Sequence, residues 1–204
     1  MEQQRVWDSI SESWGERRKK LIFQEVLDFQ KNKKGNILDV GCGSGRNILK
    51  GKKYICLDFS RNMLEYAKKN SGKNIIFVRA DAVELPIKNN SFDNVLYVAI
   101  LHVIKGSKNR KNALKELRRV MKKNGRAIIT VWNKDQPRFS KSKKESYIPW
   151  KHKEKKYMRY YYLYDEKELK NVLKSCKFKI ESISGSDSKA FRLFARNIVA
   201  IVRK

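Results

Sequence analysis

The chain has 204 residues, a length that suits one α/β domain with a sizeable hydrophobic core. Its 48 lysines and arginines outnumber its 21 aspartates and glutamates, which gives a formal net charge of +27 at pH 7. This charge favours polyanionic partners, nucleic acid before an anionic membrane, although a lysine-rich genome or a hot habitat would produce the same balance.

The cysteines and the apolar runs narrow the class further. Cys42, Cys56 and Cys176 are odd in number and widely spaced, with no C-x-x-C pair. This argues against a disulfide framework or a metal site and favours a reducing cytoplasm. No apolar run is long enough to span a membrane, and the N-terminus lacks the apolar core of a secretory signal. We expect a cytoplasmic protein without a membrane segment or bound metal.

Two helices are predicted in residues 1–34. The first has apolar residues at helical spacing, namely Val6, Trp7, Ile10 and Trp14. This helix is either a packed N-terminal cap or a lid over a ligand. The second runs from Leu21 to Phe29 and is predicted to be a core helix.

The chain is organised around residues 36–47. The apolar run Ile37 to Val40 predicts a buried parallel strand. Glycines follow at alternate positions, Gly41, Gly43 and Gly45, and glycine permits positive φ and close approach of a ligand to the backbone. We expect a short helix to begin at Arg46. Strand, glycine turn and helix N-terminus together would form a nucleotide-binding unit.

The spacing of the glycines distinguishes between nucleotides. The dinucleotide fingerprint G-x-G-x-x-G would place its third glycine one residue beyond Gly45. Asp39, at the end of the strand, suits a cationic amine better than a pyrophosphate. The stretch resembles the E/D-x-G-x-G-x-G loop of class I methyltransferases, which holds the methionine part of S-adenosylmethionine. Another nucleotide, or a turn without a ligand, is the alternative. The resemblance implies cofactor contacts from Asp39, Gly41, Gly43, Gly45, Arg46 and Asn47.

The second predicted strand ends in an acid, Asp58, and another acid, Asp81, follows the third predicted strand. Tyr54 to Asp58 lies at the distance expected of a ribose-binding carboxylate, which can accept hydrogen bonds from both ribose hydroxyls. Ser60 is left to cap the following helix. Ile75 to Arg79 is the third strand. By the same resemblance Asp81 contacts the adenine amino group, and Phe59, Ala82 and Val98 complete the cofactor site.

The remaining elements complete an α/β fold. They are a strand at Asn94–Val98, a helix face at Ala113–Met121 closed by a cap at Asn124–Gly125, a strand at Arg126–Trp132, a helix opened by a capping box at Asp165–Glu168, and strands at Phe178–Ile183 and Asn197–Val202. The resemblance implies one Rossmann-like methyltransferase domain over residues 1–204. Its seven-stranded, mostly parallel sheet would have the order 3-2-1-4-5-7-6, with helices on both faces.

Residues 133–163 interrupt the βα alternation with a basic, aromatic insertion. Lysines and arginines such as Lys151 and Arg159 alternate with aromatic residues such as Tyr147 and Trp150. Basic groups that follow phosphates and aromatic rings that stack on bases are what single-stranded RNA recognition requires. A mobile, solvated insertion is the alternative.

A narrower resemblance covers nearly the whole chain. The tRNA wobble-uridine carboxymethyl methyltransferases are similar to it at Val6–Ile10, Ile37–Asn47, Leu57–Ser60, Asn90–Tyr97, Leu101–His102, Val131–Trp132, Tyr147–Trp150 and Arg159–Tyr164. The family often has histidines where Val103 and Tyr162 stand. The resemblance implies methylation of the carboxymethyl group on the wobble uridine, in the tRNA anticodon loop, to a methyl ester. It also implies a small zinc-binding activator protein as partner.

His102, Arg159 and Tyr161 are the candidate catalytic or substrate-positioning residues, although a lone histidine is more often structural. A carboxylate acceptor needs no general base, which fits a site with few catalytic groups. The chain lacks the Asn/Asp-Pro-Pro-Tyr sequence typical of adenine methylation and a cysteine after a proline, as cytosine methylation commonly uses. The alternatives are a small-molecule methyltransferase of the quinone-biosynthesis type and a non-catalytic RNA-binding protein.

The third strand is expected at an edge of the sheet. Ile75 to Val78 carries no charge or proline to protect that edge. An apolar open edge suggests strand addition by another chain, and the resemblance names the activator. Coverage by loops of this chain is the alternative.

Overall fold

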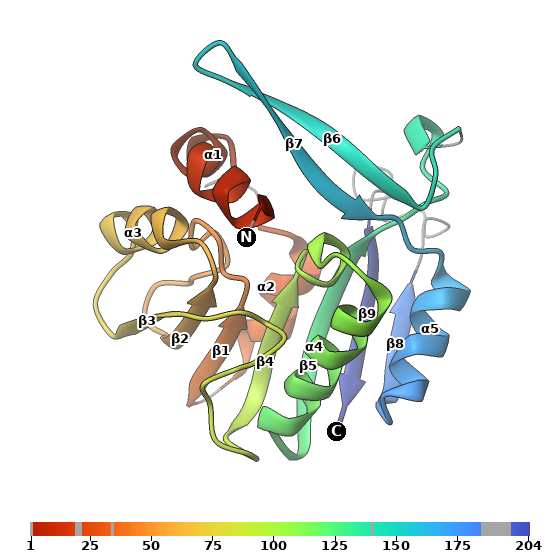
Figure 1. The fold of residues 1–204 in the computed structure, drawn as a ribbon. Helices are drawn as coiled ribbons and strands as arrows, with labels where there is room; N and C mark the ends of the chain where they lie inside the picture. The colour runs from red at the N-terminus through yellow and green to blue at the C-terminus, as the bar shows by residue number, and fades with distance from the viewer. Residues whose placement is uncertain (1, 19–21, 34, 140, 185–196) are drawn as a thin grey trace.

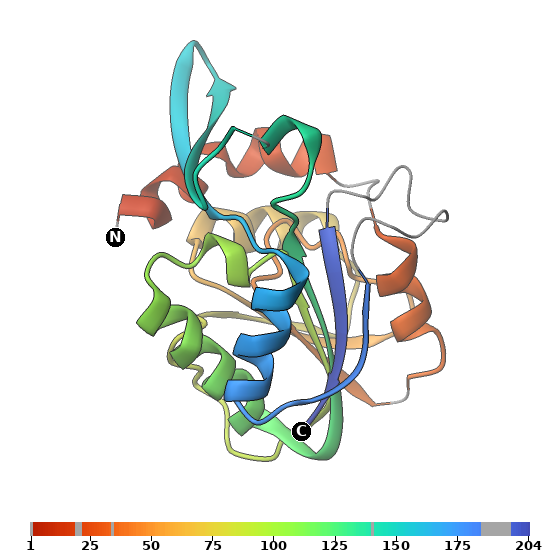
Figure 2. The same cartoon turned by 90° about the vertical axis from the view of Figure 1, so that its right-hand side faces the viewer.

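The computed structural model describes residues 2–18, 22–33, 35–139, 141–184 and 197–204 (Figures 1 and 2). Seven strands form the central sheet: β1 (Asn36–Val40), β2 (Lys53–Asp58), β3 (Ile75–Arg79), β4 (Phe92–Val98), β5 (Met121–Trp132), β8 (Lys179–Ser184) and β9 (Asn197–Arg203). Their order is β3-β2-β1-β4-β5-β9-β8. Strands β1 to β5 are parallel, and β9 is antiparallel to both neighbours. Numbered by sequence within this sheet, the order is 3-2-1-4-5-7-6, so the predicted topology is confirmed.

Helices cover both faces of the sheet, as predicted (Figure 2). The helices α2 (Gln24–Lys31) and α3 (Arg61–Asn70) pack on one face, and α4 (Ser107–Val120) and α5 (Glu166–Ser175) on the other. Side chains of a strand alternate between the faces, so Ile37 of β1 joins the first core and Leu38 the second. The helix that includes Phe29 begins at Gln24, and Leu21 lies outside the described residues.

Two sequence predictions about helices are wrong. Residues 41–47 form turns, and no helix follows the glycine loop. Gly41, Gly43 and Gly45 have φ values of 69°, 54° and 79°, which a right-handed helix does not permit. The helix before β5 ends at Val120 and is not capped at Gly125, because Met121 is already extended and pairs with Phe92 of β4.

The helix α1 (Glu2–Arg18) lies across the carboxyl end of the sheet (Figures 1 and 2). Above the sheet, β6 (Glu145–His152) and β7 (Lys155–Tyr162) form an antiparallel hairpin. Trp7 and Ile10 of α1 share a buried cluster with Trp150 and Tyr161 of the hairpin. The insertion therefore packs on the N-terminal helix.

The hairpin buries many of the aromatic rings expected to stack on bases. Phe139, Trp150, Tyr160 and Tyr161 are buried, whereas Tyr147 is 42% exposed. The expectation of free aromatic rings is wrong for the four buried ones. Trp150 and Tyr161 pack against α1. The Tyr160 hydroxyl accepts a hydrogen bond from Arg110 on the other side of the strand, and Phe139, which precedes the hairpin, packs against Trp132. The lysines at the tip, including Lys153, remain exposed.

Strand β3 lies at the sheet edge, as predicted. Ile75 and Phe77 pack toward α2 and α3, and Val78 packs on the opposite core. Ile76 is 60% exposed. No described helix is long and apolar enough to cross a membrane.

Gly125 allows two backbone segments to approach closely. A Cβ atom at this position would lie 2.9 Å from the carbonyl oxygens of Lys122 and Phe92, and backbone atoms cannot move away as a side chain can. We expect Gly125→Ala to lower the free energy of unfolding by about 1–3 kcal/mol in urea denaturation. Gly72→Ala is the control, because nothing lies within 4 Å of its Cβ position, and it should stay within about 0.5 kcal/mol. Equal stability of the two variants would contradict the prediction.

Candidate functional site

Two cavities adjoin at the carboxyl ends of β1, β2 and β4. Both are lined by Gly41, Asp58, Phe59, Ile100 and Val103. The first, about 70 Å³, extends toward α1 and the glycine loop, and the second, about 200 Å³, extends toward the end of β3. This is the edge of an open parallel sheet where ligands generally bind.

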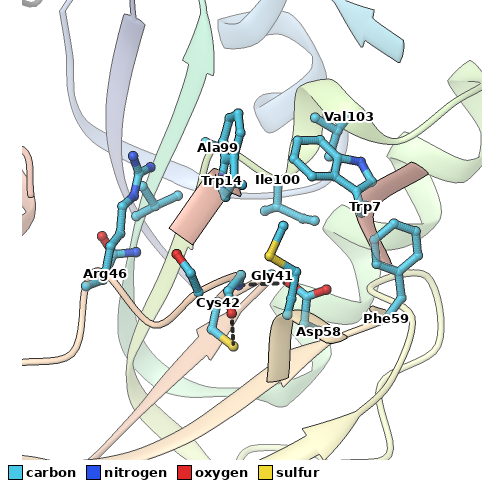
Figure 3. Close-up of a pocket in the computed structure, with 15 residues that line it drawn as sticks. Trp7, Trp14, Gly41, Cys42, Arg46, Asp58, Phe59, Ala99, Ile100 and Val103 are labelled. Carbon is cyan, nitrogen blue, oxygen red and sulfur yellow. Dashed lines mark hydrogen bonds between the residues drawn. The ribbon is translucent and has the colours of Figure 1, made fainter. Parts of the chain in front are cut away.

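Helix α1 supplies part of the wall of both cavities. Trp7 and Trp14 line the first cavity and face Gly41 and Asp58 across it (Figure 3). Gln3 lines the second. The Asp8 carboxylate accepts hydrogen bonds from the Ser60 hydroxyl at 2.6 Å and the Asn62 amide at 3.2 Å, which fixes α1 to α3. The position of α1 favours the lid interpretation. Asp8 was missed because its contact depends on residues far along the chain.

The glycine loop presents its backbone to the first cavity. A Cβ atom at Gly41 would lie 2.7 Å from the Ile100 side chain, so no larger residue fits there without displacing Ile100. At Gly43 a Cβ atom would meet nothing within 4 Å. The cavity is lined by Gly41, Gly43, Arg46 and Asn47. Gly45 does not line it and instead allows the loop to pack closely against Ala67.

Asp58 joins the end of β2 to this loop. Its carboxylate accepts hydrogen bonds from the backbone N–H groups of Gly43 and Ser60, both at 2.9 Å. Ser60 itself caps α3 by accepting from the Met63 amide, as predicted. Burial raises the pKa of Asp58 to about 6, although these hydrogen bonds oppose the shift. Each carboxylate oxygen accepts one of these bonds and keeps a lone pair for a ligand donor.

Asp39 is fully buried and lines neither cavity. Neither of its carboxylate oxygens accepts a hydrogen bond from the described residues, and the same holds for Asn47 Oδ1. Burial raises the pKa of Asp39 to about 7, partly offset by the Asn47 side chain and by the positive charge of Arg46. Uncompensated acceptors beside a cavity fit a ligand that brings hydrogen-bond donors or positive charge.

Asp81 and Ala82 line the second cavity, and Val98 the first. The Asp81 carboxylate accepts a hydrogen bond from the Val83 amide at 3.1 Å and is otherwise exposed to solvent. The structure thus places most of the predicted cofactor residues in the walls of these two adjoining cavities. Arg46 lies at one end of the first cavity, and Phe59 lies on the side of the second (Figure 3).

His102 is buried beneath this site and lines neither cavity. Its Nδ1 accepts a hydrogen bond from the Trp132 backbone N–H at 3.1 Å, which leaves the proton on Nε2. Burial lowers the pKa of His102 to about 3, and Arg46 adds to the effect. The imidazole is therefore neutral at physiological pH and stacks with Trp132 and Tyr161.

Arg159 occupies a cage of aromatic rings behind the first cavity. Its guanidinium lies 4.9–6.0 Å from the ring centroids of Trp7, Trp14, Trp150 and Tyr161. Its Nη1 donates a hydrogen bond to the Tyr161 hydroxyl at 2.9 Å, and its Nε has no hydrogen-bond partner among the described residues. Burial lowers the pKa of Arg159, and Arg18 contributes.

The field around the Tyr161 hydroxyl is strongly positive. Burial raises its pKa, while four arginines act in the opposite direction: Arg18, Arg46, Arg138 and Arg159. In the described parts of the chain no carboxylate forms an ion pair with Arg159. Those parts also contain no group of three His, Cys, Asp or Glu side chains that could hold a metal ion.

The buried charge of Asp39 predicts how stability depends on pH. Because its pKa in the folded protein lies above the ordinary 3.8, the unliganded protein should lose stability as pH rises from about 4 to about 7 and then level off. Asp39→Asn should remove the contribution of Asp39 to this loss, about 1.4 kcal/mol for each unit of pKa difference. The smaller loss that Asp58 contributes between about pH 4 and pH 6 should remain. Urea denaturation across that pH range measures it.

The matched control is Asp93→Asn, which removes an exposed carboxylate paired with Lys122 at 2.7 Å. It should leave the pH dependence of the free energy of unfolding unchanged. An Asp39→Asn variant with the pH profile of the unmodified protein would show that Asp39 does not titrate with a raised pKa.

Comparison with known proteins agrees with this geometry. The family model described as "Methyltransferase domain" matches residues 38–129. A protein of Encephalitozoon cuniculi described as a putative methyltransferase is 31% identical over 163 residues, which cover 77% of this chain and 76% of that protein.

Two further similarities are narrower. The chain is 30% identical over 126 residues to the tRNA (carboxymethyluridine(34)-5-O)-methyltransferase alkbh8 of Xenopus tropicalis, covering 57% of this chain and only 19% of that protein. A chain in the solved complex between the Haloferax volcanii Trm112 methyltransferase activator and a putative methyltransferase shares the fold. Its TM-score is 0.72 at 14% identity, with 97% of this chain and 96% of that chain covered.

The cofactor expectation is confirmed by the family. The sheet order is the one that the resemblance implied, and the match to the E. cuniculi protein extends over most of both chains. This chain belongs to the class I S-adenosylmethionine-dependent methyltransferases and resembles the tRNA carboxymethyluridine methyltransferases.

Proposed function

We propose that this protein methylates the carboxymethyl group on the wobble uridine of tRNA to a methyl ester. The observation that carries the proposal is the positive, aromatic cluster around Arg159 and Tyr161 beside the first cavity. A carboxylate acceptor is attracted by such a cluster, because the buried guanidinium of Arg159 forms no ion pair with a carboxylate of the described residues. The relatives with that activity in their names support the same substrate.

The cavities suggest how the residues hold the cofactor. Asp58 accepts hydrogen bonds from the ribose hydroxyls, and Asp81, Ala82 and Phe59 enclose the adenine in the second cavity. The amino-acid end lies along the glycine loop. There Arg46 faces its carboxylate, and Asn47 together with the buried charge of Asp39 favours its ammonium group.

When bound, S-adenosylmethionine supplies an electrophilic methyl group that the acceptor attacks directly. The residues of this chain then orient the acceptor and exclude water. A carboxylate is already ionised at neutral pH, so its attack requires no proton transfer. The neutral His102 is consistent with this, since a group with pKa of about 3 is a weak base at pH 7. His102 and Tyr161 act as positioning residues in this proposal, and Arg159 attracts the acceptor charge.

One observation favours the small-molecule alternative. The first cavity is lined largely by apolar side chains, including Trp7, Met63, Val98 and Ile100, and a compact apolar acceptor could enter it. An apolar acceptor would gain no electrostatic binding energy from Arg159 behind this cavity.

The deciding experiment supplies the protein and cofactor with tRNA that carries carboxymethyluridine. Liquid chromatography with mass spectrometry of the nucleosides should show a gain of one methyl group that mild alkali removes, as expected of an ester. A parallel reaction contains a quinone precursor. Methylation of the quinone precursor, with unmodified tRNA, would overturn the proposal.

The ribose contact predicts a binding defect. Asp58→Ala should weaken S-adenosylmethionine binding by about 1.5–3 kcal/mol, or roughly 10- to 150-fold, because hydrogen bonds to a charged acceptor are lost. Isothermal titration calorimetry measures it. Asp93→Ala, with the same change in charge far from the cavities, is the control. Unchanged affinity in a folded Asp58→Ala variant would remove Asp58 from the site.

We also propose that a small zinc-binding activator adds a strand to β3. The edge position of β3 and the exposure of Ile76 support this, since an apolar open edge is a template for another chain. The Trm112 complex, whose chain has the same fold, names the type of partner.

Ile76→Lys should abolish co-purification with a co-expressed activator, because it places a charge in the apolar strand contact. Met158→Lys, at another exposed apolar side chain, is the control and should co-purify normally. Full activity of the isolated chain on tRNA, or normal capture of the Ile76→Lys variant, would contradict the proposed partner.

A further inference from the structure

The groove between α4 and α5 lies on the opposite side of the core from α2 and α3 (Figures 1 and 2). Two cavities follow it, of about 350 Å³ near the hairpin and about 380 Å³ near the ends of both helices, and both are lined by Ser175. Neither shares a residue with the two cavities of the methyltransferase site. The groove is therefore a separate surface feature.

Positive side chains line this groove along its length. They are Arg110 and Lys111 in the upper cavity and Lys115, Arg118, Arg119, Lys177 and Lys204 in the lower one. The acidic groups nearby are already engaged. Glu116 pairs with Arg119 at 2.7 Å, and Glu168 accepts hydrogen bonds from Lys144 at 2.8 Å and from Tyr162.

Several of these cations have no acidic partner. In the part of the chain that the structure describes, no carboxylate pairs with Lys111, Lys115, Lys177 or Arg110. Arg110 is only 6% exposed, and it donates hydrogen bonds to the Ile104 carbonyl and the Tyr160 hydroxyl. A buried guanidinium without a carboxylate contributes uncompensated positive charge at the upper end of the groove.

The lower cavity also holds a fixed ammonium group. Lys204 Nζ donates hydrogen bonds to Asn90 Oδ1 at 2.7 Å and to the backbone oxygens of Met121 at 2.8 Å and Arg119 at 3.3 Å. Burial lowers its pKa, and the neighbouring Arg118 and Arg119 lower it further. Like charges are thus held together where an anion would offset their repulsion.

Helix dipoles do not account for all of this charge. Both α4 and α5 end at the lower cavity, and each helix C-terminus is equivalent to roughly half a negative charge. Two termini therefore offset about one positive charge. The lower cavity contains four cations that form no ion pair with a side-chain carboxylate of the described residues: Lys115, Arg118, Lys177 and Lys204.

We propose that the α4–α5 groove binds the phosphate backbone of the RNA substrate. This rests on the proposed function and adds a second contact, away from the reacting nucleotide. The 14 residues of α4 extend over about 20 Å, which spans about six nucleotides of a helical strand. Lysine and arginine contacts to phosphates give affinity without reading sequence.

The test uses Lys111→Ala, Lys115→Ala and Lys177→Ala together. All three side chains are exposed, so the fold should be unaffected. Binding to whole tRNA is measured at several salt concentrations, with the activator present. The slope of log affinity against log salt should fall by about 2 to 3, because each phosphate contact to a duplex contributes about 0.9. The KM for tRNA should rise, and cofactor affinity should stay unchanged.

The matched control replaces Lys31, Lys50 and Lys53 by alanine, which removes the same charge from exposed positions on α2, the β1–β2 connection and β2. A slope equal in the two triple variants would overturn the groove proposal. Failure of the unmodified protein to bind or methylate tRNA would instead overturn the proposed function. A groove variant that loses binding to phosphatidylserine vesicles but keeps its tRNA affinity would identify a membrane contact and also overturn the groove proposal.

Discussion

The contact between Asp58 and the backbone of Gly43 is the constraint on which the site depends. The chain passes from β1 to β2 without a helix, through three glycines that adopt left-handed φ values. Backbone hydrogen bonds from Gly41 and Cys42 to Leu57, and from Gly45 to Cys42, hold the two ends of this loop. The Asp58 carboxylate supplies one from the neighbouring strand and at the same time turns a buried negative charge toward the cavity. One side chain thus shapes the binding surface and forms part of it.

A second constraint is the cover formed by α1 and the hairpin. Arg159 lies between the indoles of α1 and that of Trp150, and Trp150 Nε1 donates a hydrogen bond to Ser13 Oγ at 3.0 Å. These contacts join the N-terminal helix to a hairpin that lies 137 residues away in sequence at the Ser13–Trp150 contact. The hairpin carries exposed lysines at its tip and packs on α1 through these rings. Since α1 also lines the first cavity, this helix lies between the cofactor site and the basic hairpin.

Positive charge gathers in two separate regions of this protein, the carboxyl edge of the sheet and the α4–α5 groove. At the sheet's carboxyl edge the arginines near Tyr161 accompany buried carboxylates, which suits a ligand with both signs of charge. In the α4–α5 groove the nearby carboxylates, Glu116 and Glu168, are already engaged by Arg119 and Lys144. An extended polyanion can satisfy both regions at once, whereas a small anion can occupy only one of them.

The sequence by itself determined the strands, their order and most of the cavity lining. Apolar runs that end in Asp39 and Asp58, and the glycines between them, depend on local chemistry that a single chain displays. It erred where pairing between strands overrides local preference, because β4 draws Met121 out of the helix. It also erred after the glycine loop, where Arg46 and Asn47 form turns instead of beginning a helix. Tertiary structure alone decided which aromatic rings are buried, because that depends on which face of the hairpin meets α1. It alone also decided that Asp39 lies beneath the loop, that His102 is neutral, and that cations from two helices and Lys204 meet in one groove. Burial and long-range proximity set these properties, and neither is encoded in the spacing of residues along the chain.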